Sequence, residues 1–151
     1  MKNAVLCVVV VIYLLALAGI SFAEQGTKAE AKALVEKAAA YIKVNGKEKA
    51  LAEFNNPKGK FIDRDLYIFA YDFNGVNLAL GSNPKMVGKN LLDLRDAGGN
   101  LLIRDLIEVA KKGSGWYKYK WSHPHSKKIH DKTSYVLKID DSMFIGSGVY
   151  K

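Results

Sequence analysis

The sequence predicts an α+β domain, in which an antiparallel sheet of about five strands is combined with a long N-terminal helix. Three observations favour this class. Apolar residues recur at helical spacing over 28–45 and over 101–112, and short alternating segments lie between and after these two stretches. The second stretch predicts a helix that crosses between strands two and three. We expect a sheet with its helices on one side, because each element must bury one face.

The first helix has sequence signals at both ends. Thr27 and Glu30 have the spacing of a capping box, in which each side chain accepts a hydrogen bond from the other residue's backbone N–H. Apolar residues keep helical spacing from Ala31 to Val44, and Asn45-Gly46 provides a stop. A second, short helix is expected at 47–54.

A β-hairpin is expected after the helices. The segment 66–73 has the aliphatic and aromatic composition of a strand, and 76–80 returns antiparallel to it. Asn74-Gly75 is a preferred pair for the tight turn between them. Because strand side chains alternate with a period of two, one face of the first strand carries Tyr67, Phe69 and Tyr71.

The crossing segment leads from this hairpin to the last three strands. We expect a loop at 81–88, a single helical turn at 90–94 and a helix at 101–112, which Asn100 caps. Apolar residues of this helix form one stripe, and Gly113 ends it.

The remaining strands are predicted at 116–121, 133–139 and 143–150. In the first of them, one face carries Tyr117, Tyr119 and Trp121. Large aromatic residues arranged in this way either close a core or form the floor of a pocket, where their polar tips contact a ligand. Both alternatives are open at this point.

The first 23 residues have the pattern of a secretory signal. Lys2 gives a basic start, 4–20 is an uninterrupted apolar run, and Ser21-Phe22-Ala23 supplies the small residues that a signal peptidase reads. We expect cleavage before Glu24 and a single periplasmic domain at 24–151, without Cys7, the only cysteine. An uncleaved membrane anchor is the alternative, since the run has the length of a short membrane span.

Composition argues against several functional classes. The net charge is +8, but the lysines are scattered through every segment, as expected of a solvated basic surface, and export argues against nucleic acid as a partner. There is no Gly-X-Ser-X-Gly elbow, no phosphate-binding loop and no catalytic cysteine. We therefore expect neither enzymatic activity nor a cofactor.

The histidines between the strands at 116–121 and 133–139 are candidates for a metal site. His123, His125 and His130, together with Asp131, are residue types that coordinate zinc. Lysines flank this loop at 127–128 and 132, and their positive charge opposes binding of a dication. No metal is therefore expected, although the histidines could make the loop sensitive to pH.

Several motifs, in order, resemble a single Cache domain, the extracytoplasmic sensor module of bacterial chemoreceptors and histidine kinases. The most specific are Val-Gly-Lys-Asn-Leu at 87–91 with Asp-Leu at 93–94, Tyr-X-Trp-X-X-Pro at 119–124, Lys132 with Ser-Tyr at 134–135, and Ile-Gly-Ser-Gly-Val-Tyr at 145–150. The similarity covers nearly all of 24–151.

The resemblance implies a PAS-like sheet and a pocket between this sheet and the excursion at 81–112. Family members bind small organic anions there, often short carboxylates. Many relatives have a polar residue, commonly histidine, just after the second strand's Leu-Ala, where this chain has Leu80-Gly81. The family's usual transmembrane helix and signalling domain are also not expected in this chain.

The candidate ligand-binding residues follow from the resemblance and from side-chain chemistry. Lys132 matches the family's lysine and would contact an anionic ligand, because charge-assisted hydrogen bonds are strong. Tyr119, Trp121 and Tyr135 could donate to the ligand, or could fill the core. Tyr67, Phe69 and Tyr71 present the same two alternatives. Arg104 lies on the pocket-side helix, where an ion pair with Asp105 or Glu108 is the alternative.

The sequence is compatible with two functions. The first is a periplasmic sensor module for a short-chain carboxylate that acts in signal transduction, such as chemotaxis, through a separate membrane receptor or kinase. The second is an accessory protein that has a closed pocket, binds no small ligand and docks onto another exported protein. A homodimer through the N-terminal helix is compatible with either function.

Overall fold

The structure, a computed structural model, describes residues 25–151. The predicted signal at 1–23, with Cys7, lies outside the described residues. Within 25–151, every helix is too short or too polar to cross a membrane.

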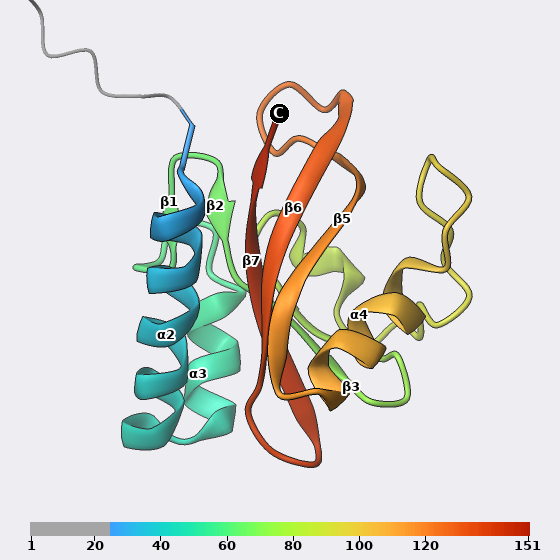
Figure 1. Ribbon diagram of the computed structural model, residues 1–151. Helices are drawn as coiled ribbons and strands as arrows, with labels where there is room; N and C mark the ends of the chain where they lie inside the picture. The colour runs from blue at the N-terminus through green and yellow to red at the C-terminus, as the bar shows by residue number, and fades with distance from the viewer. Residues whose placement is uncertain (1–24) are drawn as a thin grey trace, which may run out of the picture.

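A five-stranded antiparallel sheet forms the centre of the domain (Figure 1), as predicted. Its strands are β3 (Phe69–Asp72), β4 (Asn77–Leu80), β5 (Ser114–Ser122), β6 (Ile129–Lys138) and β7 (Met143–Tyr150). The spatial order is β4-β3-β7-β6-β5, so the last strand of the chain lies in the middle, between β3 and β6. The α+β class is confirmed.

Helices cover both faces of this sheet, so the prediction that they share one side is wrong. The helices α2 (Lys28–Asn45) and α3 (Lys47–Phe54) lie on one face, and α4 (Leu102–Lys111) lies on the other (Figure 1). The strands explain the arrangement, because their alternating side chains are apolar in both directions. Ile145 of β7 packs under α2, whereas Phe144 packs under α4.

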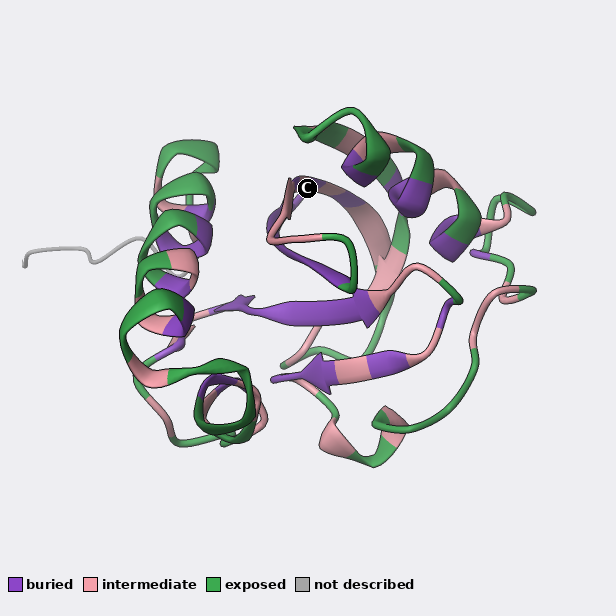
Figure 2. Cartoon of the chain, turned by 90° about the horizontal axis from the view of Figure 1, so that it is seen from below, coloured by how far each residue is buried: buried purple, intermediate pink, exposed green. Residues whose placement is uncertain are grey.

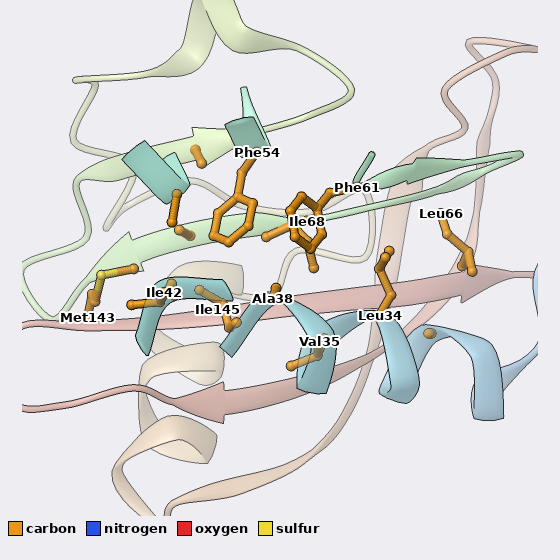
Figure 3. Close-up of a cluster of buried hydrophobic side chains, with 14 of the residues drawn as sticks. Leu34, Val35, Ala38, Ile42, Phe54, Phe61, Leu66, Ile68, Met143 and Ile145 are labelled. Carbon is orange, nitrogen blue, oxygen red and sulfur yellow. The ribbon is translucent and has the colours of Figure 1, made fainter. Parts of the chain in front are cut away.

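The core under α2 is aliphatic and aromatic (Figure 3). Side chains of the two N-terminal helices meet those of β3 and β7, and the members labelled in the figure include Val35, Ala38, Phe54, Ile68 and Ile145. Figure 2 shows the buried face of α2 turned toward the sheet. The predicted capping box at Thr27 and Glu30 is present, and both predicted N-terminal helices are confirmed.

The crossing segment differs from the prediction in two places. The turn at 90–94 is not helical, and a short 3-10 helix, η1 (Pro84–Met86), precedes it. Asn100 does not cap α4, because its side-chain amide donates instead to Asp96. The Asp96 carboxylate also accepts from the backbone N–H groups of Gly98, Asn100 and Lys120, so it ties this loop to β5.

The predicted strand at 66–73 is divided in the structure. Its first part is β2 (Leu66–Tyr67), which pairs with β1 (Ile62–Asp63) in a separate two-stranded ribbon. The turn of this ribbon contacts the start of α2. Asp65 accepts from the backbone N–H of Gly26 at 2.7 Å, and Arg64 forms an ion pair with Glu30 at 2.8 Å.

Candidate ligand site

Lys132 is a buried lysine on the face of the sheet that α4 covers. Its side chain is among the largest fully buried ones, with 1% of the residue exposed. The Nζ atom donates a hydrogen bond to the Tyr67 hydroxyl at 2.7 Å. Aromatic rings surround it, with centroids at 4.0 Å for Tyr67, 4.8 Å for Tyr150 and 5.8 Å for Phe69. Such rings attract a cation with their faces.

The strand register brings the ring hydroxyls to Lys132. Lys132 on β6 lies opposite Tyr119 on β5 and opposite Tyr150 on β7. Residues directly opposite in adjacent strands point to the same side, so both tyrosines share the face that carries Nζ. The Tyr119 hydroxyl is hydrogen-bonded to Ser134 at 3.0 Å, two residues further along β6.

The hydroxyls continue from Lys132 as a directed chain. The Tyr67 and Tyr150 hydroxyl oxygens lie 2.8 Å apart, and the Tyr150 hydroxyl donates to the backbone carbonyl of Ser122 at 3.0 Å. Because Tyr150 uses its only proton on Ser122, Tyr67 must donate to Tyr150 and accept from Lys132. This row of hydroxyl groups therefore offers no acceptor for the other protons of Nζ.

The electrostatics of this cluster favour an added negative charge. Burial lowers the pKa of the Lys132 ammonium, and its interactions with Tyr67 and with the more distant carboxylate of Asp65 offset only part of that effect. Burial alone would raise the pKa of the Tyr67 hydroxyl, but the neighbouring charge of Lys132 brings it below the usual value. An anion beside Nζ would stabilise the charged lysine, since an opposite charge favours ionisation.

A small cavity of about 10 Å³ lies against this cluster. Six of the predicted ligand-binding residues line it: Lys132, Tyr119, Trp121, Tyr67, Phe69 and Tyr71. The opposite wall comes from α4, through Leu102, Ile103 and Leu106. A space of this size holds about one water molecule, so a ligand must displace side chains in order to enter.

A larger pocket of about 450 Å³ adjoins the cavity and shares Leu80 and Trp121 with it. We call this larger pocket the mouth. Its other lining residues are Ser82, Asn83, Lys85, Met86, Ser122, His123, Pro124 and Lys127. They come from the segment after β4, from the end of β5 and from the turn between β5 and β6, and none is acidic. Sequence reasoning missed most of them as pocket residues, because only the tertiary fold brings these two loops together.

Two of the predicted residues lie away from the cavity. Tyr135 is an odd number of residues from Lys132 on the same strand and therefore points to the opposite face, where its ring contacts Trp116 at 5.3 Å. Arg104 is half exposed and pairs with Asp93 at 2.6 Å. The prediction that Arg104 pairs with Asp105 or Glu108 is therefore wrong.

The three histidines lie close together, but their ring nitrogens point to different protein groups. His125 Nε2 is 2.9 Å from the carbonyl oxygen of Arg64, and His130 Nδ1 is 3.1 Å from that of Lys151. His123 accepts two backbone N–H groups with Nδ1. Over 25–151, no three histidine, cysteine or acidic side chains are arranged to hold a metal ion.

The sequence is similar to those of known proteins. A model described as single Cache domain 2 matches residues 19–151. The sensor histidine kinase MctS of Rhizobium johnstonii is 40% identical over 88 residues, which are 58% of this chain and 19% of that protein. The methyl-accepting chemotaxis protein CtpM of Pseudomonas aeruginosa is 34% identical over 108 residues, 70% of this chain and 19% of that protein. The chain thus spans about a fifth of these relatives.

Solved structures share the fold. A methyl-accepting chemotaxis protein from Vibrio parahaemolyticus superposes with a TM-score of 0.70 at 32% identity, over 82% of this chain and 87% of that chain. A Cache chemosensory domain, studied for carboxylic acid recognition, superposes with a TM-score of 0.62 at 25% identity, over 78% of this chain and 84% of that chain.

Proposed function

The chain belongs to the single Cache domain family, and from this premise we propose that it is an extracytoplasmic sensor module that binds a short carboxylate beside Lys132. Relatives with this domain are chemotaxis receptors and a sensor kinase, which supports the sensor role. The structural neighbour that recognises carboxylic acids supports the ligand class.

The observation that carries the proposal is the buried ammonium of Lys132. Its one hydrogen bond to protein goes to a phenol, and no ion pair joins it to a carboxylate within residues 25–151. Leaving a charge in an apolar site without a direct ion pair is costly, so such a site gains most from an anionic ligand. The Tyr67 hydroxyl and the Trp121 indole are further polar groups at the cavity.

The shape of the cavity favours a ligand with few carbons. The cavity beside Nζ has a volume of only about 10 Å³, and its walls are mainly aromatic and aliphatic. Leu80 stands at the boundary between the cavity and the mouth, in the region where many relatives have a polar residue. A carboxylate with a short apolar tail matches these walls better than a highly hydroxylated acid does.

Export and signalling are part of the same proposal. The segment 1–23 would direct export and would then be removed. The ligand-bound domain would act on a separate membrane receptor or kinase. The outer face of α2, which is exposed along its length, would form a homodimer seam.

A second function is favoured by the small volume of the cavity. An accessory protein whose pocket is filled by its own side chains would have a site of this size, and would bind a protein partner instead of a small ligand.

A thermal-shift screen separates the two functions. Ligands that bind only the folded state raise the melting temperature in proportion to occupancy. We expect acetate, propionate, lactate or pyruvate to stabilise residues 24–151, and Lys132→Ala to abolish the response. A flat response across these acids, malate, succinate and amino acids would favour the accessory function.

A further inference from the structure

Asp65 is a buried acid in the turn of the β1–β2 ribbon, although turn acids are usually solvated. Only 1% of the residue is exposed. Its Oδ1 atom accepts a hydrogen bond from the backbone N–H of Gly26, but Oδ2 has no hydrogen-bond partner among the described residues. The nearest basic group to Oδ2 is Nε2 of His123, at 3.9 Å. Buried carboxylate oxygens without a partner are uncommon and require an explanation.

The ring of His123 holds its own turn in shape. Nδ1 accepts from the backbone N–H groups of His125 at 3.2 Å and Ser126 at 3.3 Å. An atom that accepts two N–H groups cannot carry a proton, so the neutral ring has its proton on Nε2, facing Asp65. Backbone hydrogen bonds from His123 to Lys128 and from Lys127 to His123 complete the turn.

This turn forms one wall of the mouth. His123, Pro124 and Lys127 line the mouth on one side, and Ser82 and Lys85 line it on the other. Lys127 has a φ of 59°, in the left-handed region that is unfavourable for a residue with a β-carbon. A turn with such a residue relaxes readily when the hydrogen bonds that hold it are lost.

Most of the groups around the His123 ring oppose its protonation. Those that face it are Asp65 and Arg64 from the ribbon, His125 and Lys127 from its own turn, His130 and Lys132 from β6, Tyr150 from β7 and Lys85 across the mouth. Burial lowers the pKa of His123, and the two other histidines and Lys132 lower it further, against the attraction of Asp65.

We propose that His123 is a positioning residue that holds this wall of the mouth in place while its ring is neutral and releases the wall when Nδ1 takes a proton from solvent. The protonated Nδ1 repels the two N–H groups that it accepted before. The imidazolium is then drawn to the unpartnered oxygen of Asp65, away from the turn. Regulation of ligand entry by this movement rests on the proposed function, but the movement itself does not.

The first test uses the full chain without ligand. Long-range ¹⁵N spectra should show the Nε2–H tautomer of His123 at neutral pH. The rate of hydrogen exchange at the His125 and Ser126 amides, divided by the intrinsic rate at each pH, should rise about tenfold as the pH falls through the titration of His123. An Nδ1–H tautomer, or exchange that does not change with pH, would overturn the proposal.

Variants separate the titration from a purely structural role. In His123→Asn, the side-chain oxygen still caps the turn but does not titrate, so amide exchange should stay low at acid pH. In His123→Ala there is no acceptor, and exchange should be fast at every pH. His130→Gln should keep the response of the unmodified protein.

Movement of this wall is measured by acrylamide quenching of Trp121, which lines both mouth and cavity. Replacing Trp116 by Phe leaves Trp121 as the only tryptophan. Quenching should increase about twofold at acid pH, and adding His123→Asn should abolish the increase. Quenching that is equal in both proteins would contradict the proposal. Because no ligand is added, this result is independent of whether a carboxylate binds.

Discussion

The Nζ atom of Lys132 donates to the hydroxyl of Tyr67, 65 positions away in the chain, at 2.7 Å. A buried lysine usually pairs with a carboxylate, but this one meets a phenol whose own proton is used on Tyr150. The pair links β6 to the short ribbon and holds a positive charge beside an apolar cavity. The buried charge of Lys132 therefore costs stability in the ligand-free protein, whereas in the proposed function the same charge contacts the ligand.

Replacing Lys132 with Met should stabilise the ligand-free protein. The substitution removes a buried charge that no carboxylate contacts directly and retains most of the side-chain volume, so we expect a gain on the order of 1 kcal/mol in the free energy of unfolding. Urea denaturation measures it. Lys118→Met, on the exposed side of β5, is the control and should change stability little. A loss of several kcal/mol in Lys132→Met would mean that the ammonium is satisfied in the ligand-free protein.

Replacing Tyr67 with Phe should destabilise the protein. The substitution removes the acceptor of Lys132 and the donor to Tyr150, and a buried polar group left without a partner costs about 1–3 kcal/mol. The double variant Tyr67→Phe with Lys132→Met should recover most of this loss, because the unsatisfied ammonium is then absent. Additive effects in this double-mutant cycle would show that the two side chains are not coupled.

Asp96 should contribute stability that acid removes. Burial alone would raise the pKa of its carboxyl, but hydrogen bonds from the backbones of Lys120, Asn100 and Gly98 hold it below the usual value. A lowered folded pKa gives stability that is present above the unfolded pKa, about 3.9, and is lost as the pH falls through the folded one. Asp96→Ala should lower the free energy of unfolding by about 1–3 kcal/mol at neutral pH. The stability of this variant should also fall less steeply as the pH falls into the acid range. The control is Asp93→Ala, at an exposed ion pair.

His123 should make stability depend on pH in a different window. Its folded pKa is lowered, so the folded state binds fewer protons than the unfolded one. Stability should therefore fall as the pH falls from the unfolded value, about 6.5, to the lower folded value. Denaturation at several pH values should show this slope in the unmodified protein and a smaller slope in His123→Asn. An equal slope in both would assign the dependence to other groups.

Local patterns were enough to predict most of the fold. The capping box predicted the start of α2, and the period of two placed Tyr67, Phe69 and Tyr71 on the face where the structure has them. The ribbon of β1 and β2 was missed because strands of two residues show no periodicity. The cap at Asn100 was predicted wrongly because Asp96 competes for its side chain.

The site was predictable only in part. Lys132 and Tyr135 are three positions apart, so strand alternation alone separates them. Helical spacing likewise sets Arg104 apart from the apolar stripe of α4. The mouth and the contact between Asp65 and His123 depend on loops that meet only in the tertiary structure. No local sequence pattern reports such contacts.

Calorimetric titration of residues 24–151 with propionate and with propionamide, its uncharged analogue of similar shape, decides whether Lys132 contacts a carboxylate. If Lys132 is the anion contact, propionate should bind, propionamide should not, and Lys132→Met should lose propionate binding while remaining folded. Equal binding of the two compounds, or full propionate binding by Lys132→Met, would contradict a carboxylate site at Lys132.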